Sequence, residues 1–323
     1  MNLERLEQLE AAVSRAYPNI TGIVVRKNNT AVYENHWNGF SADDAVHVFS
    51  VTKSVVSALI GIAIAQGGIE SVDQNIWDFF PACTARDPAA QNVTIRQLLT
   101  MTAPFRYKEE PYEAFFASEN WVGAALDFLG GEYTGQFLYS PIIGAHILSG
   151  ILVRATGQPV LDFAREHLFL PLGIADVCSI PLHSREEQFA FYAEQKHAPG
   201  WIADPQGVHT ASWGLALTPA DLAKIGQLYA NGGSWAGRQL LPASWIAEST
   251  RMHSRCGNLS YGYLWWVVDE QEGSYAALGD GGNAVYVNPE KQLVVSIAAL
   301  FTPNAPDSVG LIQQYIEPMF EME

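Results

Sequence analysis

The segment HVFSVTKS occupies residues 47–54 and opens the most apolar stretch of the chain. Between residues 45 and 69, Lys53 is the only residue with a fixed charge, in a run dominated by Val, Ile, Leu, Ala and Phe. A helix that is apolar on most of its faces is buried, and the pair of glycines at 67 and 68 predicts its end. We therefore expect Lys53 to lie in the interior, on a helix over about residues 50–66.

The spacing of Ser50 and Lys53 indicates a reactive pair. An unpaired ammonium is costly to bury, so the pKa of the Lys53 amine should fall. Residues i and i+3 share a helix face, which lets a neutral Lys53 act as general base for the Ser50 hydroxyl. At the helix N-terminus, Ser50 would also have free backbone N–H groups for an oxyanion. The alternative is a surface lysine that snorkels beside an N-cap serine.

Other kinds of catalytic site are not indicated. No serine has glycine at both −2 and +2, the nucleophile elbow of α/β-hydrolases, although Ser212 and Ser234 come nearest. The chain has no His-Glu-x-x-His, paired Cys-x-x-Cys, glycine-rich phosphate loop or dinucleotide fingerprint. Its eight histidines are scattered, and we interpret them as structural or surface residues. The sequence therefore predicts neither a metal nor an organic cofactor.

Composition limits the partners. The 323 residues include 18 Lys and Arg against 34 Asp and Glu, a formal net charge of −16. Such a charge disfavours nucleic acid, anionic membrane surfaces and anionic substrates, so we expect a small-molecule substrate that is not anionic. Cys83, Cys178 and Cys256 lie far apart, as reduced thiols do in a cytosolic protein. The N-terminus predicts an acidic amphipathic helix rather than a signal peptide, so a cytoplasmic location is expected. The oligomeric state stays open.

β-forming sequence lies at the two ends of the chain. Residues 20–26 and 31–34 predict a hairpin, and strands are expected again at 261–268, 284–287 and 293–300. The residues from about 73 to 250 are typical of helices and loops. We predict an α+β fold in which both termini build one antiparallel sheet, with terminal helices on one face. The predicted boundaries are 1–68 with 256–323 for the sheet domain and 69–255 for an inserted helical domain.

The motif at 47–54 resembles the nucleophile motif of the serine β-lactamase-like superfamily. Among its branches, the class C β-lactamases, D-alanyl-D-alanine carboxypeptidases and esterases are the most similar. Later segments resemble further motifs of that family in the same order: TIRQLLTMT at 94–102, FLYS at 137–140, WGLALTPADLA at 213–223, YGYLWW at 261–266 and GDGGN at 279–283. The resemblance covers most of the chain and implies a β-lactamase-like fold, in agreement with the two-layer prediction.

The resemblance also implies roles for individual residues. Ser50 would attack the substrate, Lys53 would take its proton, and Tyr139 would pass the proton to the leaving group. Ser140 and Pro141 are typical of an N-cap and first helical position, so Tyr139 should lie just outside a helix start. The backbone N–H groups of Ser50 and Asn283 would form an oxyanion hole. Substrate contacts are expected from Asp280, Gly281, Gly282 and Trp213, with Trp201 and Tyr107 as further pocket walls.

Two positions depart from the family pattern. Pro141 stands where the family has an asparagine, and Asp280 stands where it has a Lys or His that binds a substrate carboxylate. Two like charges about 5 Å apart repel by about 3 kcal/mol at an effective dielectric of about 20. Asp280 therefore argues against carboxylate-bearing substrates, unless its side chain faces away from the cleft as a turn residue.

We hypothesise a serine hydrolase that cleaves an ester or amide of a neutral or cationic small molecule through a Ser50 acyl-enzyme. One alternative is a β-lactamase or D,D-peptidase, against which the expected cytoplasmic location argues because peptidoglycan lies outside the membrane. Another is a catalytically weak binding or regulatory protein whose site has drifted. The acyl and leaving groups of the substrate stay open.

Overall fold

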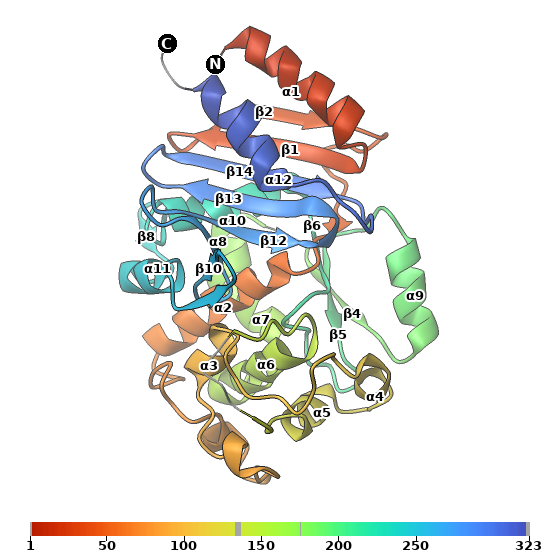
Figure 1. Ribbon diagram of the computed structural model, residues 1–323, viewed down its shortest axis with the longest axis vertical. Helices are drawn as coiled ribbons and strands as arrows, with labels where there is room; N and C mark the ends of the chain where they lie inside the picture. The colour runs from red at the N-terminus through yellow and green to blue at the C-terminus, as the bar shows by residue number, and fades with distance from the viewer. Residues whose placement is uncertain (1, 133–136, 175, 321–323) are drawn as a thin grey trace.

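The computed structural model describes residues 2–132, 137–174 and 176–320. Figure 1 shows a sheet with terminal helices in the upper half and a mainly helical part below it. The long helix α2 (Val51–Ala65) packs against the sheet on one side and against α6 (Ile143–Thr156) on the other. The predicted buried helix is therefore the element that joins the two parts.

One antiparallel sheet combines the two ends of the chain. In the described residues it has eight strands in the order β2-β1-β14-β13-β12-β11-β10-β9. The two ends of the chain meet where β1 pairs with β14, in a register that places Ile23 opposite Ile297. The strands are β1 (Ile20–Lys27), β2 (Thr30–His36), β9 (Ser254–Cys256), β10 (Leu259–Tyr261), β11 (Trp266–Asp269), β12 (Ser274–Gly279), β13 (Asn283–Asn288) and β14 (Leu293–Ala299). The predicted α+β fold with a sheet built from both termini is confirmed.

The terminal helices cover one face of this sheet, as expected. Helix α1 (Leu3–Ala16) and α12 (Ser308–Leu311), which continues as irregular helical turns to Met319, lie on the same side in Figure 1. Leu9 and Val13 of α1 pack with Ile312 and with the strand residue Ile23 in one buried cluster. The burial of this apolar surface is what holds both chain ends on the sheet.

A helix from the middle of the chain covers the other face. Helix α10 (Pro219–Ala230) packs against β1, β13 and β14, although the predicted boundaries place it in the helical domain. A Cβ atom at Gly226 would lie 2.6 Å from Cγ1 of Val294 and 2.7 Å from Cγ1 of Val285, so the helix backbone approaches the strands closely there. A sheet with two apolar faces needs two covering layers, and the terminal helices supply only one.

The helical part also contains short strands that the sequence did not predict. A second sheet has the order β3-β6-β5-β4, and β7 pairs with β8. The strands of this second sheet are β3 (Val46–His47), β4 (Cys178–Pro181), β5 (Gly200–Ala203) and β6 (Leu215–Leu217). The separate hairpin consists of β7 (Ser234–Trp235) and β8 (Arg238–Gln239). The prediction of nearly all helix and loop from about residue 73 to 250 missed the strands β4 to β8, because strands this short cannot show an alternating pattern. The remaining helices are α3 (Ile95–Leu99), α4 (Tyr112–Phe116), α5 (Trp121–Asp127), α7 (Val160–Ala164), α8 (Leu170–Leu172), α9 (Arg185–Ala193) and α11 (Ala243–Ser249).

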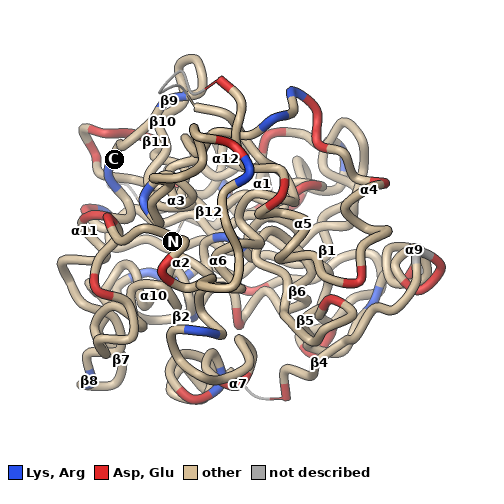
Figure 2. The backbone as a smooth tube through the Cα atoms, turned by 90° about the horizontal axis from the view of Figure 1, so that it is seen from below, with Lys and Arg blue, Asp and Glu red and all other residues tan. Residues whose placement is uncertain are grey.

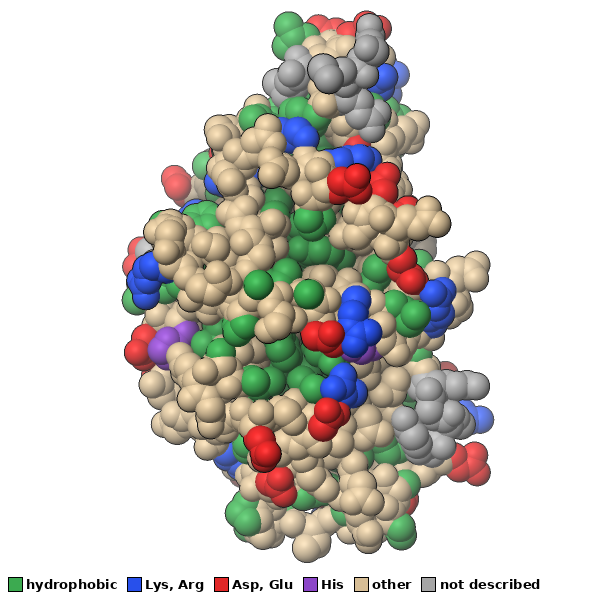
Figure 3. Space-filling view, turned by 90° about the vertical axis from the view of Figure 1, so that its left-hand side faces the viewer, with side chains coloured by type: hydrophobic (Ala, Val, Ile, Leu, Met, Phe, Trp, Pro, Cys, Tyr) green, Lys and Arg blue, Asp and Glu red, His purple; other side chains and the backbone are tan. Residues whose placement is uncertain are grey.

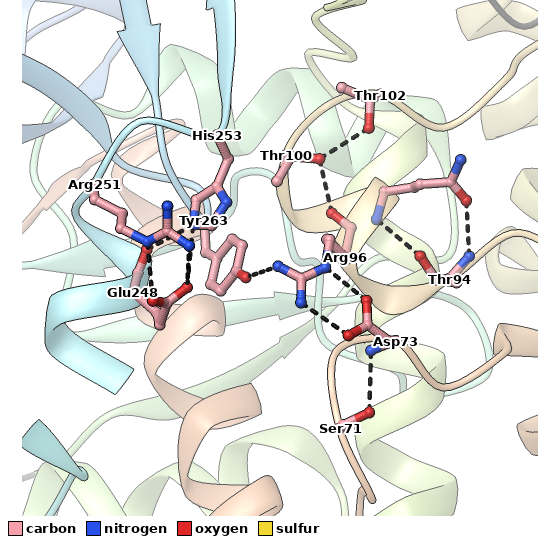
Figure 4. A network of polar contacts seen from close by, with 11 residues as sticks. Ser71, Asp73, Thr94, Arg96, Thr100, Thr102, Glu248, Arg251, His253 and Tyr263 are labelled. Atoms are coloured by element: carbon pink, nitrogen blue, oxygen red, sulfur yellow. Dashed lines mark hydrogen bonds and ion pairs between the residues drawn. The ribbon is translucent and has the colours of Figure 1, made fainter. Parts of the chain in front are cut away.

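A polar network ties α3 to the segment before β11 (Figure 4). The guanidinium of Arg96 donates to both carboxylate oxygens of Asp73, at 2.6 and 2.9 Å, and to the hydroxyl of Tyr263. Nearby, the backbone amide of Leu264 donates to the carbonyl of Leu99 at 3.0 Å. The segment at 94–102, which carries one of the family-like motifs, thus fixes the helical part to the sheet part.

Charged residues of both signs are distributed along the backbone over the whole molecule (Figure 2). On the face seen in Figure 3, Lys and Arg lie beside Asp and Glu, and hydrophobic side chains reach the surface between them. Exposed pairs such as Arg251 with Glu248, at 2.8 Å, contribute at most about 1 kcal/mol to stability. None of the helices in the described segments is long and apolar enough to span a bilayer.

We predict that Gly226→Ala lowers the free energy of unfolding. Alanine favours a helix by about 1 kcal/mol over glycine, but overpacking against two stiff valine side chains costs about 1–3 kcal/mol. Urea unfolding followed by circular dichroism measures the difference. A variant as stable as the wild type would show that α10 is not seated on the sheet at this residue.

Candidate active site

Ser50 is presented by a strained turn. Phe49, directly before it, has a φ of +49°, which is unusual for a residue with a side chain. The carbonyl of Phe49 accepts hydrogen bonds from the amide of Thr52 at 3.1 Å and from its hydroxyl at 2.7 Å, and these bonds hold the turn. The side chain of Ser50 makes no capping bond to α2. Although Ser50 is the N-cap residue, its hydroxyl is therefore not used to cap the backbone of α2.

Lys53 lies in the interior, with 1% of its surface exposed. Its Nζ is 3.0 Å from Oγ of Ser50, 2.6 Å from the carbonyl oxygen of Pro141 and 3.1 Å from the carbonyl oxygen of Ser212. The alternative of a snorkelling surface lysine is therefore wrong. Two of the three partners are carbonyls, which only accept hydrogen bonds. A neutral amine can donate its two N–H groups to them and direct its lone pair at the Ser50 hydroxyl.

Burial lowers the pKa of Lys53 to about 7, although the carboxylates of Glu110 and Asp280 act in the opposite direction. The charged form of an amine is disfavoured when water is excluded, and nearby negative charge compensates for part of that loss. With a pKa near 7, the amine exists in both forms at neutral pH. This is the condition that a general base for a serine hydroxyl requires.

Tyr139 completes the group. Its hydroxyl is 3.3 Å from Oγ of Ser50, and Nζ of Lys53 lies 5.2 Å from the centre of its ring. Burial raises the pKa of Tyr139 to about 12, while the hydrogen bond to Ser50 acts against the rise. The phenol is therefore protonated at neutral pH and has a proton to give. The structure brings Ser50, Lys53 and Tyr139 together, as the sequence predicted.

The end of β12 lies against the nucleophile. A Cβ atom at Gly279 would be 2.2 Å from the carbonyl oxygen of Val48 and 3.3 Å from the amide nitrogen of Ser50, so only glycine fits. The next residue, Asp280, is exposed. Burial is the largest cause of the pKa shifts of Lys53 and Tyr139, and the carboxylate of Asp280 acts to raise both values.

The two glycines after Asp280 shape the turn. Gly281 is buried with a φ of +79°, and its carbonyl accepts a hydrogen bond from the side chain of Asn19 at 2.6 Å. The carbonyl of Gly282 accepts one from the Ser308 hydroxyl at 2.6 Å. These two residues therefore hold the turn in place. Both line the cavity of about 310 Å³ at the turn, and the substrate contacts expected of them stay a prediction.

Asn283 does not reach the surface of the site. It is fully buried, and its side-chain amide donates to the carbonyls of Asp280 at 2.8 Å and Ala299 at 2.9 Å. An oxyanion donor has to be reached by the substrate. The structure therefore does not support Asn283 as the second donor, and the exposed part of the turn, at Asp280, is better placed.

The aromatic residues expected as pocket walls lie deeper than predicted. Trp201 is fully buried in β5, where its Nε1 donates to the carbonyl of Thr210 at 2.8 Å, so it is a core residue. Trp213 is 4% exposed, and its ring lies behind Tyr192 at a centroid distance of 5.7 Å. The hydroxyl of Tyr107 is 3.2 Å from that of Ser140. Trp201 and Trp213 are therefore buried, whereas Tyr107 is half-buried beside Ser140.

Other aromatic side chains surround the opening of the site. Tyr112, Tyr192 and Phe301 are exposed by 42%, 39% and 59%. Phe49, Tyr192 and Phe301 line a cavity of about 170 Å³ beside the nucleophile, and Phe301 also lines one of about 310 Å³ against the Asp280 turn. Burial raises the pKa values of Tyr112 and Tyr192, and the carboxylate of Asp280 adds to the rise in both. Sequence reasoning missed these residues because they come from loops and helices far apart in the chain.

The fold and this group of side chains define a β-lactamase-like protein, with a Ser-x-x-Lys pair at the start of the helix between its two parts and a tyrosine on the nucleophile. The chain belongs to the Beta-lactamase family, whose model matches residues 8–315. Members of this family with this fold are serine hydrolases, among them esterases and amidases.

Known proteins are similar to this chain at low sequence identity. The 6-aminohexanoate-dimer hydrolase of Paenarthrobacter ureafaciens is 20% identical over 300 residues, which cover 84% of this chain and 70% of that protein. Among solved structures, a family VIII carboxylesterase is 17% identical with a TM-score of 0.71, covering 97% of this chain and 96% of that one. A penicillin-binding protein homologue from Pyrococcus abyssi is 20% identical with a TM-score of 0.72, covering 99% and 78%.

We predict that a fluorophosphonate probe labels Ser50 at a rate that rises through about pH 7. We expect neutral Lys53 to act as the base, and its pKa of about 7 makes the neutral form predominant above that pH rather than above 10. Lys53→Arg should label at least about a hundredfold more slowly, because guanidinium stays protonated. Lys53→Met, a smaller change in shape, should be equally slow. Wild-type labelling rates in folded Lys53→Arg would mean that another group takes the proton.

Proposed function

We propose that this protein is a serine hydrolase that cleaves an ester or amide of a neutral or cationic small molecule through a Ser50 acyl-enzyme. The observation that carries the proposal is the geometry of Lys53. Its Nζ is 3.0 Å from Oγ of Ser50, and the carbonyls of Pro141 and Ser212 occupy its other hydrogen-bonding directions. A buried lysine held in this way has its lone pair directed at the serine hydroxyl.

The reaction follows from these positions. Lys53 takes the hydroxyl proton while Oγ of Ser50 bonds to the carbonyl carbon of the substrate. When the tetrahedral intermediate collapses, the bond to the leaving group breaks and the Tyr139 phenol gives that group a proton. The phenol recovers a proton from the Lys53 ammonium. Water then attacks the acyl-enzyme with the same groups in reverse, which restores Ser50.

The developing oxyanion needs donors beside the nucleophile. One is the backbone amide of Ser50, at the first turn of α2, where the helix dipole is positive. For the second we propose the backbone amide of Asp280, because Gly279 packs against Ser50 and the next residue is exposed. Loss of one such donor typically slows catalysis by about 10²–10³.

The charge of the site supports a substrate that is not anionic. Asp280 and Glu110 are the charged residues whose carboxylates raise the pKa values of Lys53 and Tyr139. A β-lactam or D-alanyl-D-alanine substrate would bring a carboxylate into this field. The names of two similar proteins, an amide-dimer hydrolase and a carboxylesterase, agree with amide or ester cleavage.

We predict that the wild type hydrolyses p-nitrophenyl acetate much faster than nitrocefin. Ser50→Ala should lose ester hydrolysis down to the uncatalysed rate, because no nucleophile remains, while Ser14→Ala on the exposed face of α1 should keep it. Both are measured spectrophotometrically. Full activity in Ser50→Ala would contradict the serine mechanism, efficient nitrocefin turnover would favour a β-lactamase, and failure on all esters tested would favour a binding protein.

We also predict that Asp280 sets the preferred substrate charge. An ester with a distal ammonium should react roughly tenfold faster than its carboxylate isostere, as expected for one partly screened charge. Asp280→Asn should reduce the preference, and Asp280→Lys should reverse it. The control Asp78→Asn removes an exposed carboxylate that does not act on Lys53 or Tyr139. The measurement is kcat/KM for both esters at low and high salt. The same preference in all variants would assign Asp280 to the turn alone.

A further inference from the structure

Glu110 makes a set of contacts that the reaction scheme above does not use. Its carboxylate accepts hydrogen bonds from the backbone amides of Ile142 at 2.9 Å and Ile143 at 3.0 Å, and from the hydroxyl of Ser140. The hydroxyl of Tyr107 adds a longer contact of 3.4 Å. Four donors therefore converge on one side chain that comes from a loop about 30 residues earlier in the chain.

These contacts act as a cap for helix α6. The prediction of Ser140 as N-cap was wrong by two residues: the helix begins at Ile143, and its N-cap residue, Ile142, has no side chain that can accept the first amides. Among the helix amides, the Ser140 hydroxyl accepts only that of Gly144, at 2.7 Å. Such amides need partners, and a carboxylate at a helix N-terminus also interacts favourably with the helix dipole. From outside the helix, Glu110 supplies both the hydrogen-bond acceptors for these amides and the negative charge at the helix N-terminus.

The capped segment carries two groups of the active site. Ser140 stands between Tyr139, whose hydroxyl is 3.3 Å from Oγ of Ser50, and Pro141, whose carbonyl is 2.6 Å from Nζ of Lys53. A shift of Ser140 would move both groups at once.

Ser212 holds the opposite side of the same segment. Its hydroxyl donates to the carbonyl of Ile142 at 2.7 Å, and its own carbonyl is 3.1 Å from Nζ of Lys53. The segment from Tyr139 to Ile143 is thus fixed between Glu110 and Ser212, and its position relative to the base depends on both.

We propose that Glu110 is a positioning residue for the hydrolase reaction: its carboxylate holds the segment 139–143 so that the Tyr139 hydroxyl and the Pro141 carbonyl remain on Ser50 and Lys53. The proposal rests on the proposed function for its kinetic test, but not for its structural test.

The charge of Glu110 has a second effect, which provides a diagnostic readout. The charged groups that act on Lys53 are Glu110 and Asp280, and both raise its pKa against the effect of burial. Around Glu110 itself lie the phenols of Tyr107, Tyr112 and Tyr139. Removal of the Glu110 charge should lower the pKa of Lys53, so the rise of kcat/KM with pH should move to lower pH.

The kinetic test uses Glu110→Gln, Glu110→Asp and the control Glu109→Gln. Glutamine has nearly the same shape, but its amide N–H groups oppose the amides of Ile142 and Ile143. We expect kcat to fall about 10- to 100-fold with little change in KM, as is usual for small misplacement of reacting groups, and the pH profile to shift downward. Glu110→Asp keeps the charge and should restore the profile and part of the rate. Glu109→Gln removes an exposed charge next to it and should behave as wild type.

The structural test is a crystal structure of Glu110→Gln, which needs no turnover. We expect the distance from the Tyr139 hydroxyl to Oγ of Ser50 to exceed the 3.3 Å of the wild type. Unchanged distances, or wild-type kcat and pH profile in Glu110→Gln, would overturn the proposal. A fall in melting temperature with an unchanged profile would reduce Glu110 to a helix cap. An inactive wild type with altered distances in the variant would refute the hydrolase function while leaving the positioning role intact.

Discussion

The structure depends on one constraint, the burial of the Lys53 amine in an apolar interior. Its nitrogen must find partners there, since an unpaired polar group in the core is costly. The partners are Ser50 on the same helix and the carbonyls of Pro141 and Ser212, which come from two segments about 70 residues apart. Satisfying one nitrogen therefore fixes α2, the start of α6 and the loop before β6 relative to one another. The same contacts that allow lysine to be buried also leave it suited to accept a proton.

A second constraint places the sheet against this helix. The backbone before Ser50 turns through a left-handed conformation at Phe49, a strain of about 1–3 kcal/mol that the surrounding packing has to hold. The end of β12 packs directly on that turn, where Gly279 leaves no room for a side chain. The sheet thus supports the strained turn and at the same time brings Asp280 to the edge of the site. The same contacts therefore stabilise the fold and determine the geometry of the site.

The electrostatic balance of the site comes from burial, which is the larger effect, and from nearby carboxylates, which act against it at Lys53. Burial lowers the pKa of Lys53, and the carboxylates of Glu110 and Asp280 raise it, with a result of about 7. Burial raises the pKa of Tyr139 to about 12, so the base and the acid beside Ser50 have well-separated pKa values. Two groups separated in this way can take and give a proton within one reaction. The negative charge of Glu110 and Asp280, which acts to raise the pKa of Lys53, should also repel an anionic substrate.

The sequence by itself determined the buried helix with its reactive pair and the sheet built from both ends of the chain. It also determined that Tyr139 precedes a helix. Each of these features depends on a local pattern of side chains. The sequence could not determine the cover that α10 gives to the sheet or the short strands of the helical part, which depend on packing rather than on periodicity. Nor could it identify the hydrogen-bond partners of Lys53. These are the backbone carbonyls of Pro141 and Ser212, and because every residue has a backbone carbonyl, the sequence does not distinguish these two. Glu109 and Glu110 are identical side chains in one loop, and only the tertiary structure distinguishes the exposed one from the one that meets the start of α6.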